Sequence, residues 1–232
     1  MVVADPGAEL LELVRSGGDP APATVAPEVL ARAHLVRRRF GLALPAPFAQ
    51  PGDDDPVRPA TSVDGAAIAA VKWRAFGTSY RGGVLPDSFL DRRDVVPSAG
   101  FWTGRALVPP TRRHRLLVLG RPGTVFGYVD AGPAERGEGG HDPDIGEIYE
   151  LYVDPILQGR GSGSRLLAAA EAWLTDAGLD RIELSVLVTN PRAQAFYRAR
   201  GWEPTGEVRH VDLGVVAFDE ARYRRRDRSS RP

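Results

Sequence analysis

Three glycines in five positions, Gly159, Gly161 and Gly163, stand where an apolar helical stretch begins. Glycine lets the backbone approach a ligand closely, and the first amides of a helix donate hydrogen bonds to an anion at its positive dipole end. No proline lies between Pro155 and Pro191, so every amide of the turn can donate. The residues indicate either a diphosphate-binding turn or a tight strand-to-helix turn that holds only water.

Two common phosphate-binding sequences do not fit this turn. A P-loop has a lysine directly after its last glycine, whereas Ser164 and Arg165 follow Gly163. A dinucleotide-binding turn has the spacing G-x-G-x-x-G, which counted from Gly159 ends at Ser164 instead of a glycine. Residues 155–158 also separate the predicted strand from Gly159, where that fold turns at once. A nucleotide-dependent oxidoreductase is therefore disfavoured.

Composition limits the classes of function. The 232 residues are enough for one substantial domain, and 30 Lys and Arg balance 30 Asp and Glu, which does not favour nucleic acid or a membrane surface as a partner. The absence of cysteine excludes disulfides, thiolate metal sites and cysteine nucleophiles. His114, His141 and His210 are scattered in the sequence without metal-ligand spacing, so we expect no metal. Without a signal peptide or an apolar run of ~20 residues, we expect a cytoplasmic protein.

Strand and helix patterns surround the glycine turn. Period-two alternation and turn signals predict strands at 57–61, 115–119, 124–130, 146–153, 182–188, 204–209 and 215–223. Apolar residues at helical spacing, with capping residues, predict helices at 62–76, from 86 onward, at 161–177 and at 191–200. The Gly-rich stretch 131–145 is predicted to be a mobile loop. This order predicts a mixed α/β or α+β domain.

Residues 1–56 differ from the rest because prolines punctuate them. We predict a Pro-rich N-terminal extension, with short helices at 8–15 and 27–40 and a linker, then a domain at 57–226 and a basic tail at 227–232. The extension is either loosely attached or a docking or dimerising arm.

Several segments together resemble a known family. Gln158, Gly161 and Gly163 spell [Q/R]-x-x-G-x-[G/A] within "IYELYVDPILQGRGSGSRLL", and "NPRAQAFYRARGWEPTG" follows at the family's spacing. With "VRPATSVDGAAIAAVKWRAFGTSYRGGVLPDSFLD" before them, they resemble the GCN5-related N-acetyltransferases (GNAT family) over about 57–225. The resemblance implies a central mixed β-sheet flanked by helices, in which the strands at 146–153 and 182–188 splay apart.

The resemblance also implies the cofactor and the residues that bind it. Acetyl-CoA would lie between the splayed strands, its pantetheine amides paired with strand backbone and its diphosphate on the glycine turn. The expected contacts are Leu151, Tyr152, Val153, Gln158, Gly159, Arg160, Gly161, Ser162, Gly163, Ser164, Asn190 and Tyr197.

The implied reaction is direct attack of a neutral primary amine on the thioester in a ternary complex. An alkylammonium has a pKa of ~10.4, so a base that accepts its proton is needed. By resemblance, Tyr197 donates a proton to the leaving thiolate, and Glu147 is the preferred base over Glu150, unless water chains replace both. Glu147 and Glu150 are three positions apart, so alternation predicts opposite faces of their strand.

The sequence does not identify the acceptor amine, which is either a small molecule or a protein. The acceptor surface is expected from 76–90, Trp102, the 131–145 loop and the closing strands, with Tyr80, Phe89 and Trp102 as an aromatic slot or as ordinary core residues. A non-catalytic acyl-CoA-binding module with a protein partner is the alternative function. A homodimer is left open.

Overall fold

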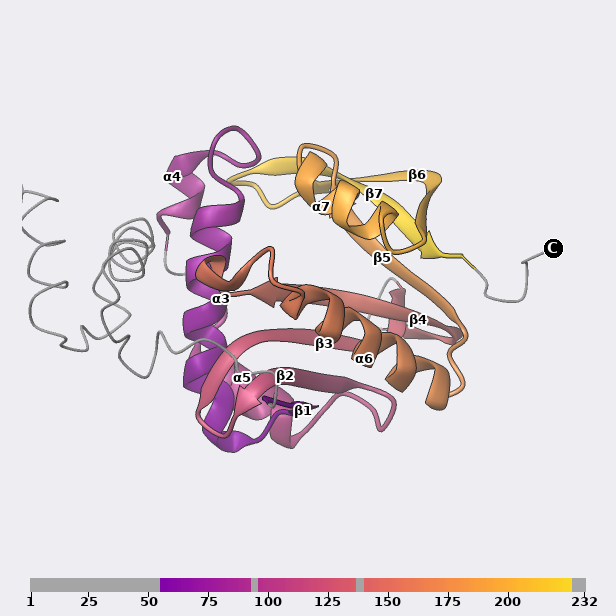
Figure 1. The fold of residues 1–232 in the computed structure, drawn as a ribbon. Helices are drawn as coiled ribbons and strands as arrows, with labels where there is room; N and C mark the ends of the chain where they lie inside the picture. The colour runs from indigo at the N-terminus through magenta and orange to yellow at the C-terminus, as the bar shows by residue number, and fades with distance from the viewer. Residues whose placement is uncertain (1–54, 93–95, 137–139, 227–232) are drawn as a thin grey trace, which may run out of the picture.

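The computed structural model describes residues 55–92, 96–136 and 140–226, which form one sheet of seven strands in the order β1-β2-β3-β4-β5-β7-β6 (Figure 1). The strands are Val57–Pro59 (β1), Arg115–Arg121 (β2), Thr124–Arg136 (β3), Gly140–Val153 (β4), Arg181–Leu187 (β5), Trp202–Asp212 (β6) and Ala217–Arg225 (β7). The helices are Gly65–Ser79 (α3), Asp87–Leu90 (α4), Ala99–Leu107 (α5), Ser162–Asp176 (α6) and Pro191–Arg198 (α7), with 3₁₀ turns at Ser62–Asp64 (η2) and Pro155–Leu157 (η5). The predicted mixed α/β fold is confirmed.

The two faces of the sheet are covered by different helices. Alternation along β2 sends Leu117 and Leu119 into the core with α6, and Leu116 and Val118 into a second core with α3 and α5. In α6 the buried side chains recur at helical spacing: Leu166, Leu167, Ala170 and Leu174. A side chain on β4 therefore points either to the face that α6 covers or to the face that α3 and α5 cover.

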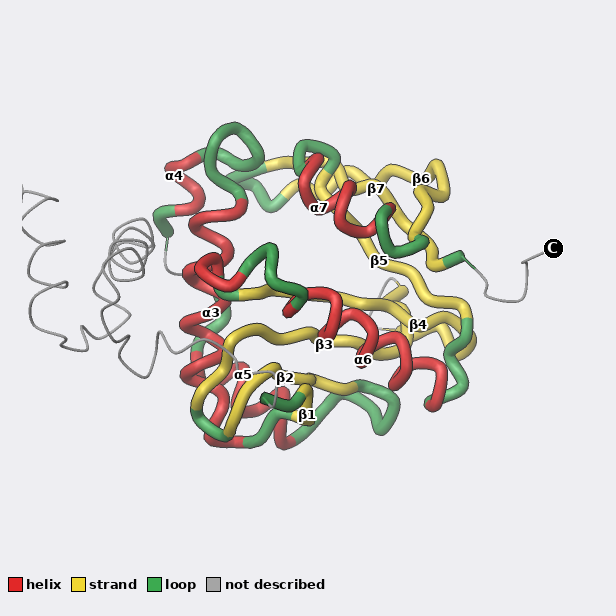
Figure 2. Tube along the Cα trace, viewed as in Figure 1, coloured by secondary structure: helices red, strands yellow, loops and turns green. Residues whose placement is uncertain are grey.

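Strands β4 and β5 run parallel but pair over a short stretch only. Their partners run from Ile145↔Arg181 to Ile148↔Leu184, and no later pair joins them within the described residues. Beyond that point β4 continues to Val153 along β3, while β5 continues to Leu187 along β7, so the two strands diverge (Figures 1 and 2). The splay expected at this pair is present.

The 131–145 stretch is not a mobile loop, so that prediction is wrong. Strand β3 extends to Arg136 and β4 begins at Gly140, and pairs such as Gly132↔Glu147 join them. Residues 131–134 are buried, which means that this stretch is part of the sheet despite its glycines. Pro133, which has no N–H to donate, stands beside a register shift in the ladder.

Helix α5 was missed by the sequence patterns. Ser98 caps it by accepting a hydrogen bond from the amide of Phe101 at 3.3 Å. Its Trp102 is buried 4.9 Å from the Tyr128 ring, centroid to centroid, and packs in the core between α5 and the sheet. Of the two roles predicted for Trp102, the core role is confirmed, and the place on the acceptor surface is wrong because Trp102 does not line the cavity described below.

The strand predicted at 57–61 and the helix predicted at 62–76 are present with slightly different bounds, as β1 and α3. A 3₁₀ turn at Ser62–Asp64 precedes α3, and Thr61 and Asp64 form the capping box of this turn.

Several predicted segments lie outside the described residues: the helices at 8–15 and 27–40, most of the 1–56 extension and the 227–232 tail. The domain boundaries therefore stay predictions. No helix in the described ranges has the length and apolar character needed to cross a membrane.

Candidate active site

The glycine turn between β4 and α6 uses its glycines in two ways. Gly159 and Gly161 have φ angles of +81° and +86°, in the left-handed region that disfavours side chains, and Gly161 is the N-cap of α6. Gly163 is needed for a close approach, because a Cβ there would lie 3.3 Å from the Phe196 ring of α7. The turn therefore presents its backbone to the open side while α7 packs closely behind it.

A cavity of about 610 Å³ extends from this turn between the diverging strands. Among the predicted cofactor contacts, those that line it are Leu151, Tyr152, Val153, Gln158, Gly159, Gly161, Gly163, Ser164, Asn190 and Tyr197. Arg160 is exposed on the turn and Ser162 is buried at the start of α6, and neither lines the cavity. The structure thus brings most of the predicted residues together around one space.

The cavity meets the requirements of an extended ligand that carries amides and a diphosphate. Residues 149–153 have no strand partner on the side that faces β5, so their backbone groups can pair with ligand amides. The amides at the start of α6 lie at the other end, where a helix N-terminus favours an anion. The chain's own residues therefore fit coenzyme A without a rearrangement of the sheet.

Arg200 is a site residue that sequence reasoning did not assign. Its guanidinium donates to Ser164 Oγ from Nε at 2.9 Å and from Nη2 at 2.6 Å, and it lies 3.8 Å over the Phe196 ring. It thereby adds a positive charge beside the first turn of α6. The only sequence signal was its spacing of four from Phe196, which puts both on one side of α7.

The Tyr197 hydroxyl lines the cavity and makes no hydrogen bond to any described residue. Its ring packs against Phe196 at 5.1 Å and Trp202 at 6.0 Å between centroids, which fixes its direction. Burial raises the pKa of this phenol, and the nearby Tyr80 raises it further. Tyr197 therefore keeps its proton at neutral pH and can donate it to a group in the cavity.

Asn190 caps α7 by accepting a hydrogen bond from the Ala193 amide at 3.0 Å. The same residue lines the cavity, so its position is compatible both with a helix cap and with the predicted cofactor contact.

Glu150 lines the cavity with both carboxylate oxygens engaged. Lys72 Nζ of α3 donates to Oε1 at 2.7 Å, and the Tyr128 hydroxyl donates to Oε2 at 2.6 Å. The Lys72 ammonium also lies 4.2 Å from the centroid of the Tyr152 ring, whose hydroxyl is 2.9 Å from that of Tyr80. Burial raises the pKa of the Tyr152 phenol, and Glu150 raises it further, so these hydroxyls stay protonated at neutral pH.

The expectation that Glu147 and Glu150 face opposite sides of β4 is wrong. Ala131 pairs with Ile148 and Asp130 pairs with Glu150, which leaves Tyr149 as an extra residue, a β-bulge. The bulge shifts the alternation by one. Both glutamates consequently point away from α6, toward the face that α3 and α5 cover.

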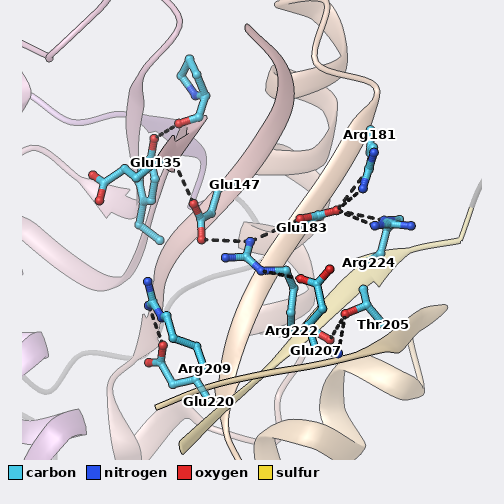
Figure 3. Close-up of polar contacts among 12 residues, drawn as sticks. Glu135, Glu147, Arg181, Glu183, Thr205, Glu207, Arg209, Glu220, Arg222 and Arg224 are labelled. Atoms are coloured by element: carbon cyan, nitrogen blue, oxygen red, sulfur yellow. Dashed lines mark hydrogen bonds and ion pairs between the residues drawn. The ribbon is translucent and has the colours of Figure 1, made fainter. Parts of the chain in front are cut away.

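Glu147 lies next to the cavity but does not line it. It is buried, its Oε2 accepts a hydrogen bond from the Glu135 amide at 3.0 Å, and its Oε1 lies 3.6 Å from Nη1 of Arg222 (Figure 3). Arg222 also contacts Glu183 at 3.3 Å and Glu207 at 3.8 Å, so one guanidinium serves three carboxylates. Burial raises the pKa of Glu147, and Arg222 and the Glu135 amide offset only part of that rise.

Two of the histidines that are scattered in the sequence meet in the structure. The rings of His114 and His141 are 4.9 Å apart, and His114 Nε2 is 3.1 Å from the Tyr149 hydroxyl. Burial lowers the pKa of His114 to about 4, and Arg105 and His141 contribute to the decrease. Within 55–92, 96–136 and 140–226, no three potential ligands are grouped to hold a metal ion.

Residues 87–202, half of the chain, match the family described as "Acetyltransferase (GNAT) family". The mycothiol acetyltransferase of Salinispora arenicola is 32% identical over 195 residues, which cover 80% of this chain and 57% of that protein. The mycothiol acetyltransferase of Beutenbergia cavernae is 43% identical over 74 residues, which cover 32% of this chain and 24% of that protein. The chain thus spans less than two thirds of these two relatives.

A solved structure gives the same assignment of the fold. The PaiA N-acetyltransferase from Thermoplasma acidophilum, in complex with coenzyme A, superposes with a TM-score of 0.57 and 16% identity over 72% of this chain and 96% of that one. At this identity the likeness concerns the fold. Together with the family match over half of the sequence, it confirms the resemblance inferred from the glycine turn and its flanking segments. The chain belongs to the acetyltransferase (GNAT) family.

Proposed function

We propose that the protein is an acetyl-CoA-dependent N-acetyltransferase that acts on a primary amine by direct attack in a ternary complex. One observation carries the proposal. A single cavity joins the glycine turn, the unpaired edge of β4 and the unbonded hydroxyl of Tyr197. One extended ligand in this cavity would thereby have its anionic group bound, its amides paired with β4 and a proton donor within reach.

The residues that would hold acetyl-CoA follow from the chemistry of each wall. The amides of 159–163 would bind the diphosphate, with Arg200 as a positive charge beside them. The backbones of Leu151 and Val153 would pair with the pantetheine amides. When bound, acetyl-CoA supplies the thioester carbonyl that the amine attacks.

Tyr197 is proposed as the proton donor to the leaving sulfur. A thiol has an ordinary pKa of ~8.5, so a donor that stays protonated at neutral pH assists its departure. The raised pKa of Tyr197 and its position on the cavity wall support this role.

For the base, Glu147 and Glu150 both remain candidates. Glu150 borders the cavity and can accept a proton directly, although Lys72 and Tyr128 already hold its oxygens. Glu147 is outside the lining and would act through water, and burial raises its pKa, which favours acceptance of a proton. Glu147→Gln and Glu150→Gln separate them, because only loss of the true base removes the decrease in kcat/KM at acid pH.

Thiol release from acetyl-CoA, measured against an amine library, tests the proposed function. We expect turnover with at least one primary amine and acetylated product of matching mass. Cofactor binding without turnover on any amine would support the non-catalytic alternative. The cytoplasmic location stays a prediction. The sequence left two points open, the homodimer and whether the acceptor is a small molecule or a protein.

A further inference from the structure

The cavity has two chemically different ends, on opposite faces of the sheet. At the first end are the glycine turn and Arg200, which follows the end of α7 and binds Ser164. This end is cationic, as a diphosphate requires. The second end lies on the face that α3 covers, where Glu150 and Tyr152 project from β4.

Two carboxylates approach the second end from opposite sides of the gap. Glu150 comes from β4, and Glu220 comes from β7, where it pairs with Leu187 of β5. Ala221 and Tyr223 pack in the core under α6, so alternation points Glu220 to the opposite face. Both carboxylates line the cavity, and each therefore faces whatever occupies it.

Each of these two carboxylates has one cationic partner among the described residues, and only one of those partners lines the cavity. Lys72 lines it, and its ammonium is bound to Glu150 at 2.7 Å. Arg209 binds Glu220 at 2.7 Å, but its side chain is 63% exposed and does not line the cavity. Because the Arg209 side of this ion pair is largely exposed to solvent, a ligand ammonium in the cavity can compete with it for Glu220.

Aromatic rings form the remaining wall of this end. Phe76, Tyr80, Phe89 and Phe218 gather there with α4 and the end of β5. The Tyr80 and Tyr152 hydroxyls, 2.9 Å apart, offer oxygen atoms that can accept hydrogen bonds from an ammonium. Rings of this kind also attract a cation over their faces.

We propose that the acceptor is an aliphatic amine that carries a second positive charge, such as a linear diamine. This rests on the proposed function. One amine would lie toward Tyr197 and the thioester, and the second ammonium would lie against Glu220. An acceptor with a carboxylate in place of the second ammonium would meet two glutamates, and the Lys72 ammonium beside them is already bound to Glu150.

Three acceptors of equal length test the charge preference: hexamethylenediamine, hexylamine and aminocaproate. Their amines have similar basicity, so the rates compare the far end of each molecule. On the wild-type protein we expect kcat/KM to fall in that order by about tenfold per step, after a twofold correction for the two amines of the diamine.

Two variants locate the preference. Glu220→Gln should reduce the ratio of kcat/KM for the diamine to kcat/KM for hexylamine by about tenfold. Arg209→Gln breaks the same ion pair but leaves the carboxylate, so the preference should persist or increase. A variant that only misfolds would lose activity with all three amines alike. In that case the order of kcat/KM for the three amines on the wild-type protein tests the proposal.

Equal rates for the three amines, or a preference for aminocaproate, would overturn the inference and leave the proposed function intact. Absence of turnover with the diamine would overturn it too, and the amine library then decides whether the proposed function survives. A loss of preference in Arg209→Gln that equals the loss in Glu220→Gln would assign the effect to the ion pair and would also refute the proposal.

Discussion

Replacement of Tyr197 by phenylalanine separates catalysis from packing more cleanly than any other change at the site. The hydroxyl has no hydrogen bond to lose within the described residues, and the ring contacts with Phe196 and Trp202 are retained. We therefore expect the free energy of unfolding to change by less than ~0.5 kcal/mol. If the phenol donates its proton in the transition state, kcat should fall by roughly 10²–10⁴-fold, about 3–5 kcal/mol.

Tyr223→Phe is the matched control. Tyr223 is 1% exposed, its hydroxyl is 3.4 Å from Gln194 Oε1, and it does not line the cavity. This variant should lose about 1 kcal/mol of stability and keep its kcat. Tyr197→Phe should thus lower kcat and keep its stability, whereas Tyr223→Phe should lose stability and keep its kcat.

The assays are steady-state thiol release, calorimetric titration with acetyl-CoA and urea unfolding, each on both variants and the wild type. Acetyl-CoA affinity of Tyr197→Phe should stay within about threefold of the wild type, because the proposed interaction belongs to the transition state. An unchanged kcat would refute the donor role. Equal losses of kcat and of cofactor affinity would indicate a packing role instead.

Other predictions concern the turn and the fold around it. Gly161→Glu, which adds a side chain at φ +86° and a negative charge at the diphosphate turn, should abolish acetyl-CoA binding in calorimetry, and unchanged affinity would contradict the assignment of the turn. Asp64→Asn should cost about 3 kcal/mol at neutral pH, because Asp64 is buried and accepts hydrogen bonds from two Arg58 nitrogens at 2.8 Å and from the Gly123 amide at 2.9 Å. Hydrogen bonds from Arg58 hold the pKa of Asp64 well below its usual value against the effect of burial, so this stability is complete above pH ~4 and decreases as pH falls below it. Urea unfolding from pH 7 to pH 2 should therefore show the variant and the wild type converging in acid. A constant difference at every pH would argue against the ion pair. Gly163→Leu should destabilise the packing of α7 against α6 and lower the melting temperature, whereas Gly159→Ala, with no atom near its Cβ position, should affect the turn alone.

Features that depend on neighbours in the sequence were predictable. The left-handed glycines before α6 and the cap of α7 by Asn190 are set by short-range sterics and hydrogen bonds, which leave a clear mark in the residues. The splay of β4 and β5 came from the family resemblance, since no local pattern says where two distant strands stop pairing.

The bulge at Tyr149 was not predictable from alternation. An extra residue in one strand changes which face every later side chain uses, yet it alters neither the composition nor the apolar pattern enough to be read. That single residue determines that Glu147 and Glu150 share a face.

Contacts between residues that are far apart in the sequence could not be predicted either. Arg200 meets Ser164 only because α7 packs on the first turn of α6, and Glu220 meets the cavity only because β7 lies beside β5. The 131–145 stretch was misread for a related reason, because its glycines suggested a loop while pairing with the neighbouring strand made it a hairpin. Tertiary pairing overrode local composition in each case.

Lys72 is the one lysine in the 232 residues, and it is buried against Glu150 and the Tyr152 ring. If the proposed function holds, these 232 residues consequently present no exposed lysine of their own to acetyl-CoA. The remaining basic side chains are arginines, whose guanidinium groups stay protonated and are poor nucleophiles. Any acetyl-lysine that an antibody detects in a mixture of folded proteins with acetyl-CoA should therefore belong to another protein.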